Sequence, residues 1–299
     1  MTLIEDFKKI SKGILIYSKV LDIDEEIMNL YTKNFEEKEF DLYPKFNQRD
    51  NLHYIEIESF SINKLNTLKS KLKKTDFTNI IELQISQNNN LLNQTGITGS
   101  VIWKSSFLLS KYLLSIYTLF EGKNVLELGT GTGIVGITLS KLLVKKKVNF
   151  ELILTDQEIL LSQIQKNMAL NGLDKVSNVH CKEFSWDTIT ENKITTLNNF
   201  NQYHWIQQYS TGFDIILLSD LIYNENVNLL LVNTIKLLLT INSQAVLLIA
   251  QELRAAYVIE EFISLLFENN ICLERAIFND NTNLPNNIVI YLGYLNKKE

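Results

Sequence analysis

The sequence predicts an α/β protein built on a doubly wound, mostly parallel β-sheet. From Ser100 onward, short apolar runs alternate with longer segments of helical apolar spacing, the order typical of parallel strands and crossover helices. Residues 213–219, FDIILLS, are almost entirely apolar, as a parallel strand covered on both faces must be. Glycines at alternate positions follow the first apolar run, at the edge where such sheets bind ligands.

The N-terminal region, residues 1–85, has a different pattern, since it contains only one of the eleven glycines, Gly13. Residues 1–38 have helical apolar spacing, whereas residues 52–62 and 80–86 alternate as strands do. We therefore expect an N-terminal α+β extension over residues 1–85, containing helix and antiparallel strands. The main domain then covers residues 86–299.

Seven strands are expected in the main domain, over residues 124–128, 151–155, 176–181, 213–219, 244–250, 271–278 and 288–295. The expected helices are 101–120, 134–143, 159–170, 227–239 and 255–268. Residues 187–211 are polar and irregular and are interpreted as an insertion. Because no helix separates the last two strands, we expect the last strand to insert antiparallel.

Composition excludes several classes of protein. A net charge of −5 argues against an electrostatic nucleic-acid binder. Two cysteines and three histidines argue against a disulfide framework and a structural zinc site. The N-terminus has no signal-peptide pattern, and no apolar run is long enough to span a membrane. We expect a monomer in the cytoplasm, with the nucleus as a second location, and no nucleic acid or membrane partner.

The strongest motif is Glu127-Leu-Gly-Thr-Gly-Thr-Gly133, directly after the first strand of the main domain. Such glycines let the backbone turn sharply and approach a ligand closely. The string from Gly131 to Gly136 also matches the dinucleotide pattern GxGxxG. However, the Glu127 carboxylate would repel a pyrophosphate and attract an ammonium or sulfonium group. The loop therefore favours S-adenosylmethionine, with a nicotinamide dinucleotide and a purely structural turn as alternatives.

Two further acids end predicted strands. Asp156 follows the second strand, where an acid binds a ribose diol in adenosine cofactors, or else caps the next helix. Asp220 follows the buried fourth strand, where it needs a partner, and Tyr223 lies three residues further on. Asp220 is a candidate to hold a substrate ammonium; alternatively it caps the next helix, a duty that Asn224 or Asn226 could perform instead.

Three other side chains are weaker candidates. Trp103 and Trp186 fall near the expected cofactor loops, where an indole either stacks on the cofactor or packs in the core. Glu252 and Arg254 end the fifth strand, and Arg254, in a chain with few arginines, either has a functional role or forms a surface ion pair.

The strings GSVIWKSS at 99–106, VLELGTGTGIVG at 125–136, LTDQ at 154–157 and SDLIY at 219–223 resemble methyltransferase family 16. This is the seven-β-strand, S-adenosylmethionine-dependent group of protein lysine methyltransferases. Glu252-Leu-Arg254 and the other strings are most similar to its branch of valosin-containing-protein lysine methyltransferase and fungal ribosomal lysine methyltransferase 5. The resemblance covers about residues 80–295, and residues before it carry no motif that matches.

The resemblance implies a Rossmann-like class I methyltransferase fold, S-adenosyl-L-methionine as cofactor, and a protein substrate that bears the target lysine. Ribosomal proteins, translation factors and the valosin-type ATPase are the expected substrates. It implies that Asp220 and Tyr223 face the lysine. The implied cofactor residues are Trp103, Glu127, Gly129, Thr130, Gly131, Gly133, Asp156, Gln157, Trp186 and Ser219. A small-molecule methyltransferase, a nicotinamide-dependent reductase and a non-catalytic Rossmann-like binding protein are the alternatives.

Overall fold

The computed structural model describes residues 2–32, 51–60, 78–88, 98–188, 203–278 and 287–296. Most of the predicted insertion, residues 189–202, lies outside the described residues, as do residues 33–38 of the predicted N-terminal helical segment.

The main sheet contains the seven predicted strands and one more, in the order β1-β9-β10-β8-β7-β4-β5-β6. The predicted strands are β4 (Lys123–Leu128), β5 (Phe150–Asp156), β6 (Val179–Glu183), β7 (Ile215–Ser219), β8 (Val246–Glu252), β9 (Ile271–Phe278) and β10 (Ile288–Leu295). Strands β4 to β8 pair in parallel, and β10 lies antiparallel between β8 and β9. The predicted doubly wound sheet with an antiparallel last strand is therefore confirmed.

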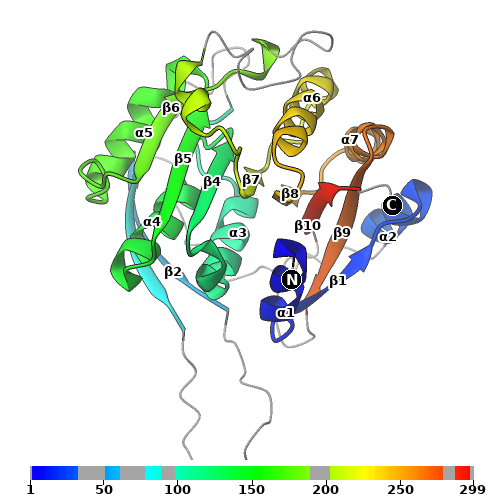
Figure 1. Cartoon of the computed structure of the whole chain (residues 1–299), viewed down its shortest axis with the longest axis horizontal. Helices are drawn as coiled ribbons and strands as arrows, with labels where there is room; N and C mark the ends of the chain where they lie inside the picture. The colour runs from blue at the N-terminus through cyan, green and yellow to red at the C-terminus, as the bar shows by residue number, and fades with distance from the viewer. Residues whose placement is uncertain are drawn as a thin grey trace, which may run out of the picture.

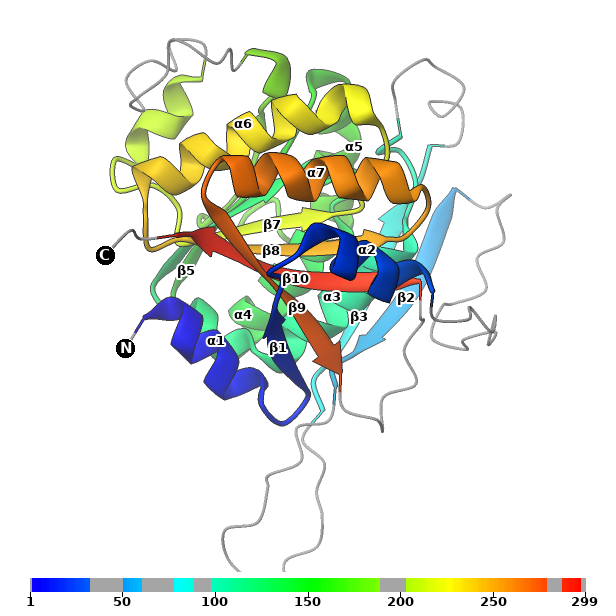
Figure 2. The ribbon, with the colours of Figure 1, turned by 90° about the vertical axis from the view of Figure 1, so that its right-hand side faces the viewer.

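Five helices in the main domain and two N-terminal helices cover the two faces of this sheet (Figures 1 and 2). One face carries α1 (Leu3–Ser11), α3 (Lys104–Ser115), α4 (Ile134–Lys146) and α5 (Glu158–Leu170). The other face carries α2 (Ile23–Tyr31), α6 (Glu225–Ile241) and α7 (Ala256–Glu268). Strands β4, β5, β7 and β8 are mostly buried on both sides, as the apolar run in β7 predicts; Ile215 to Leu218 of β7 are fully buried.

Strand β1 (Leu15–Lys19) is the eighth strand, and the sequence pattern did not predict it. Residues 1–38 were expected to be helical, yet β1 separates α1 from α2 and pairs antiparallel with β9. A five-residue strand carries almost no periodic signal of its own. Its stability comes from hydrogen bonds to a partner at the far end of the chain, which local spacing does not reveal.

Strands β2 (Leu52–Glu58) and β3 (Ile80–Ser86) form a separate antiparallel pair, as predicted. This pair packs on α3, α4 and α5. Side-chain amides of α5 fasten it, because Asn167 Oδ1 accepts from the Ser86 N–H at 2.7 Å and Asn171 Oδ1 from the Gln84 N–H at 3.1 Å. Although β1 joins the main sheet, β3 ends at Ser86, and a boundary near residue 86 stays our proposal for dividing the chain.

Candidate functional site

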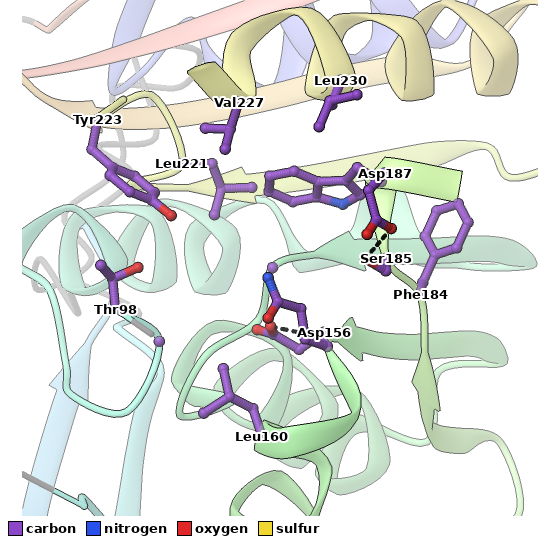
Figure 3. A pocket seen from close by; sticks show the side chains of 14 residues that line it. Thr98, Asp156, Leu160, Phe184, Ser185, Asp187, Leu221, Tyr223, Val227 and Leu230 are labelled. Carbon is purple, nitrogen blue, oxygen red and sulfur yellow. Dashed lines mark hydrogen bonds between the residues drawn. The ribbon is translucent and has the colours of Figure 1, made fainter. Parts of the chain in front are cut away.

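Two cavities open at the carboxyl ends of the parallel strands, and they share the wall formed by Thr98, Gly99, Gly129 and Leu221. The larger has a volume of about 230 Å³ and the smaller about 30 Å³. Figure 3 shows Tyr223 and Thr98 at one end of the larger cavity and Phe184 and Ser185 at the other. Glu127, Gly131, Ser219 and Asp220 lie around the smaller one. This is the edge at which doubly wound sheets bind ligands.

The glycine loop between β4 and α4 forms the floor shared by the cavities. Gly131 has φ +58°, a left-handed conformation that side chains with a β-carbon rarely adopt. A β-carbon on it would lie 2.8 Å from the carbonyl oxygen of Gly99, which crosses over the loop. The loop is thus as close to a second backbone segment as sterics allow, and both segments line the smaller cavity.

Glu127, at the end of β4, is buried beneath this loop and lines the smaller cavity. Its Oε2 has no hydrogen-bond partner among the described residues. Burial raises the pKa of its carboxyl to about 8, although interactions with the Thr130 hydroxyl and the Gly136 backbone N–H oppose the rise. A buried carboxylate with one unpartnered oxygen is costly, so Glu127 is suited to receive a cationic group in the smaller cavity.

Asp156 ends β5 at the floor of the larger cavity, beside Leu160 (Figure 3). Its Oδ2 accepts from the Gly131 N–H and its Oδ1 from the Gln157 N–H, both at 2.8 Å. Burial raises the pKa of Asp156 to about 6, although the two backbone hydrogen bonds oppose the rise. Each carboxylate oxygen has capacity for a second donor, so the residue can both hold the loop and bind a diol.

Trp103 and Trp186 lie on different cavities. Trp186 lines the larger cavity, close to Gly129, and Trp103 lines the smaller one, where its Nε1 donates to the Thr98 carbonyl at 3.1 Å. Both indoles are half-buried rather than enclosed in the core. This arrangement leaves aromatic surface available to a ligand in each cavity.

The carboxylate of Asp220 is paired in this structure. Arg254 grips it with two hydrogen bonds, Nη1 to Oδ1 and Nη2 to Oδ2, each 2.7 Å long. The Asp220 side chain is 1% exposed, whereas that of Arg254 is 36% exposed, so the guanidinium covers the carboxylate from the solvent side. Asp220 also has φ +60°, a conformation that aspartate and asparagine tolerate better than most residues.

Gln251 is a functional candidate that sequence reasoning missed. Its fully buried amide accepts from the Ile222 N–H at 2.9 Å and donates to Asp220 Oδ1 and to the Ile222 carbonyl, both at 3.0 Å. The side chain thereby holds the turn that carries Asp220. An amide at the end of an otherwise apolar strand, VLLIAQE, was the available signal.

The predicted site residues come together around the cavities, with one exception. Lining them are Trp103, Glu127, Gly129, Thr130, Gly131, Asp156, Gln157, Trp186, Ser219, Asp220 and Tyr223. Gly133 lines neither cavity and instead forms the N-cap of α4. The alternative in which Asp220 caps α6 is wrong, because Asn224 is that cap and accepts from the Asn226 N–H.

Other kinds of site are not found in the described part of the chain. Within those residues, no group of three or more His, Cys, Asp and Glu side chains is placed to hold a metal ion. Nor does any helix in these ranges have the length and apolarity needed to cross a membrane.

A doubly wound sheet with a glycine loop after one strand and an acid after the next defines a Rossmann-like protein of the adenosine-cofactor class. Within that class, a family model described as lysine methyltransferase matches residues 78–269. The chain belongs to this family.

Curated relatives agree with this assignment. Protein-lysine N-methyltransferase EFM3 of Chaetomium thermophilum is 26% identical over 67% of this chain and 54% of its own length. EEF1A lysine methyltransferase 3 of Mus musculus is 28% identical over 68% of this chain and 75% of its own. A Dictyostelium discoideum protein is 30% identical over 54% of this chain and 47% of its own length. The chain spans about half the length of the first curated relatives that it matches.

Proposed function

We propose that this protein is an S-adenosyl-L-methionine-dependent protein-lysine N-methyltransferase. Membership of the lysine methyltransferase family supports the reaction type. The structural observation that carries the proposal is the buried Oε2 of Glu127, which has no partner among the described residues and lies beside the glycine loop. A carboxylate in that position fits the ammonium group of an amino-acid-bearing cofactor and opposes a pyrophosphate.

Different residues around the two cavities suit different parts of this cofactor. Glu127 and the backbone of Gly129, Thr130 and Gly131 suit the amino-acid part, and Asp156 suits the ribose diol. Trp186, Gln157 and Leu160 suit the adenine ring, since they line the roomier cavity. Trp103 and Ser219 complete the wall of the smaller cavity. When bound, the cofactor supplies a methyl group already activated by a sulfonium charge.

Asp220 and Tyr223 belong to the acceptor side of this proposal. Both follow β7, and Tyr223 is 37% exposed at the mouth of the larger cavity. An in-line displacement needs a neutral amine about 3 Å from the methyl group and collinear with the bond that breaks. The chain therefore has to orient the lysine nitrogen and favour its deprotonated form, because free lysine has a pKa of about 10.4.

We propose that the substrate is a translation factor, and that the enzyme works as a monomer in the cytoplasm. The support is in the names of relatives, which include EEF1A lysine methyltransferase 3 and Protein-lysine N-methyltransferase EEF2KMT of Homo sapiens. Incubation with labelled cofactor and a lysate of the same organism should label one dominant protein on lysine. Label on ribosomal proteins or on a valosin-type ATPase would redirect the substrate assignment, and absence of protein label would refute the reaction type.

Substitution of Asp220 tests the proposed acceptor site. Asp220→Asn keeps a side chain that tolerates φ +60°, so we expect S-adenosylhomocysteine affinity within about twofold of wild type and methyl transfer reduced by roughly a hundredfold. Asp174→Asn, an exposed position, is the matched control and should change neither quantity. Normal transfer by Asp220→Asn would remove this residue from the acceptor site.

Calorimetry separates the proposal from its main alternative. We expect S-adenosylhomocysteine to bind and NADH to give no heat. Binding of NADH instead would favour a reductase, and methyl transfer to small molecules alone would favour a small-molecule methyltransferase.

A further inference from the structure

The pair formed by Arg254 and Asp220 lies on the acceptor side of the proposed site. The guanidinium makes two 2.7 Å hydrogen bonds to a carboxylate that is almost completely buried. It also lies over the ring of Trp103, 5.1 Å from the ring centroid, and Trp103 lines the smaller cavity. Trp103 therefore contacts the pair and borders the site at the same time.

Four charged side chains form a neutral network here. Glu252 accepts from Arg254 Nη2 at 2.8 Å, and Lys104 Nζ lies 3.7 Å from the other Glu252 oxygen. Two positive and two negative groups therefore alternate along the edge of the site. The hydrogen bonds that Arg254 donates to Asp220 raise the pKa of the guanidinium, so its positive charge is permanent in the working range.

This neutrality matters for the reaction. A buried carboxylate without a cation would stabilise a nearby ammonium and raise the pKa of the acceptor lysine by about one to three units. The protonated amine has no lone pair and cannot take the methyl group. A carboxylate that is already neutralised by a cation does not raise the pKa of the acceptor lysine in this way, so the amine loses its proton more readily.

We propose that Arg254 is a positioning residue that neutralises Asp220, so that the site receives its methyl acceptor as a neutral amine rather than as an ammonium. This inference rests on the proposed function and deepens it. Arg254 acts through Asp220, whose orientation Gln251 also fixes. Its guanidinium meets the carboxylate with the two parallel hydrogen bonds that a lysine ammonium cannot reproduce.

The pH dependence of turnover tests this role. The rising limb of kcat against pH reports deprotonation of the bound lysine. Arg254→Met should move that limb upward by about one pH unit, and Arg254→Lys should move it much less. The double variant Asp220→Asn with Arg254→Met removes both charges and should return the limb to the wild-type position, whatever its rate. A merely structural Arg254 would lower kcat equally at every pH.

The other charged and titratable groups around the acceptor site are the same in the wild type and in these variants. They are Glu252, Lys104, Glu127, Asp156 and Tyr223. Glu127 itself titrates in this range, so the comparison uses saturating cofactor and the difference between variants. The acceptor is the lysate protein that the wild-type enzyme labels most strongly. A limb that stays in place in Arg254→Met would overturn the inference.

A binding measurement keeps the inference separate from the proposed function. n-Butylamine mimics the lysine side chain, and its affinity for the enzyme with S-adenosylhomocysteine can be measured by calorimetry at pH 8 and pH 10. Wild type should bind it more tightly at pH 10, where more of the amine is neutral. Arg254→Met should lose or reverse that preference, and an identical trend in both proteins would overturn the inference. If no lysate protein is labelled, the proposed function fails while this comparison still decides the role of Arg254.

Discussion

The backbone of Gly99 crosses directly over Gly131, so that a β-carbon on Gly131 would lie 2.8 Å from the Gly99 carbonyl oxygen. One glycine precedes α3 and the other follows β4, and both line the smaller cavity. Asp156 holds the Gly131 backbone in place, because its carboxylate accepts a hydrogen bond from the Gly131 N–H. The proposed cofactor floor is therefore two backbones in contact, and it has no room for a side chain.

Gly131→Ala should displace this crossing and weaken S-adenosylhomocysteine binding by at least roughly tenfold. Gly122→Ala is the matched control, because Gly122 has φ +68° but nothing within 4 Å of its built β-carbon. Both variants carry the left-handed penalty of about 1–2 kcal/mol, and only Gly131→Ala adds the clash. Calorimetry should find the control within about twofold of wild type; equal losses would show that the crossing is unimportant for binding.

Glu127 should make cofactor binding depend on pH. Its carboxyl has a pKa of about 8 in the free protein, and a cationic ligand lowers that pKa by favouring the charged form. Affinity for S-adenosylhomocysteine should therefore fall as pH drops below about 8, by up to roughly tenfold per unit. Glu127→Gln should bind weakly with a flat profile between pH 6 and 8. Exposed Glu121→Gln should retain the wild-type slope, and a sloped Glu127→Gln profile would contradict the assignment.

Stability of the free protein should decrease with rising pH over the same range. Burial raises the pKa values of Glu127 and Asp156 to about 8 and about 6, above those of the unfolded chain. The folded state thus binds more protons, and its stability falls as pH rises from about 4 to about 8, by an amount on the order of a few kcal/mol. Urea midpoints without cofactor at pH 5 and pH 8 measure this. Glu127→Gln should have the smaller difference, and an equal difference would place the titration elsewhere.

Glu26 should be essential for the attachment of the N-terminal region. Its buried carboxylate, on α2, accepts from the Tyr291 hydroxyl at 2.8 Å and lies 3.2 Å from Arg275 Nη1 on β9. Glu26→Ala would leave a mostly buried guanidinium and hydroxyl unpaired, which costs about 3 kcal/mol of unfolding free energy. Glu25→Ala, at an exposed neighbour, should cost at most about 1 kcal/mol. Urea unfolding that shows similar losses would mean that α2 contributes little to the fold.

Much of the architecture could be predicted because its signals are local. The bounds of β3, β9 and β10 agree with the predicted residues, since alternation and apolar runs reflect burial of each strand by itself. β1 could not be predicted, because five residues acquire their strand conformation from β9, far along the chain. The glycine loop and its flanking acid were recognisable for the same reason as the strands: their conformation and chemistry are contained in a few consecutive residues.

The sequence by itself determined the sheet, the loop and the acids that follow the strands. It did not determine which cationic side chain pairs with the Asp220 carboxylate. That was decided by the pairing of β7 with β8, in which Ser219 stands opposite Ala250 and the residues that follow them become neighbours. A guanidinium 34 residues away then reaches the carboxylate. The charge balance of the acceptor site is thus a property of tertiary structure, because it depends on which strand ends the fold brings together.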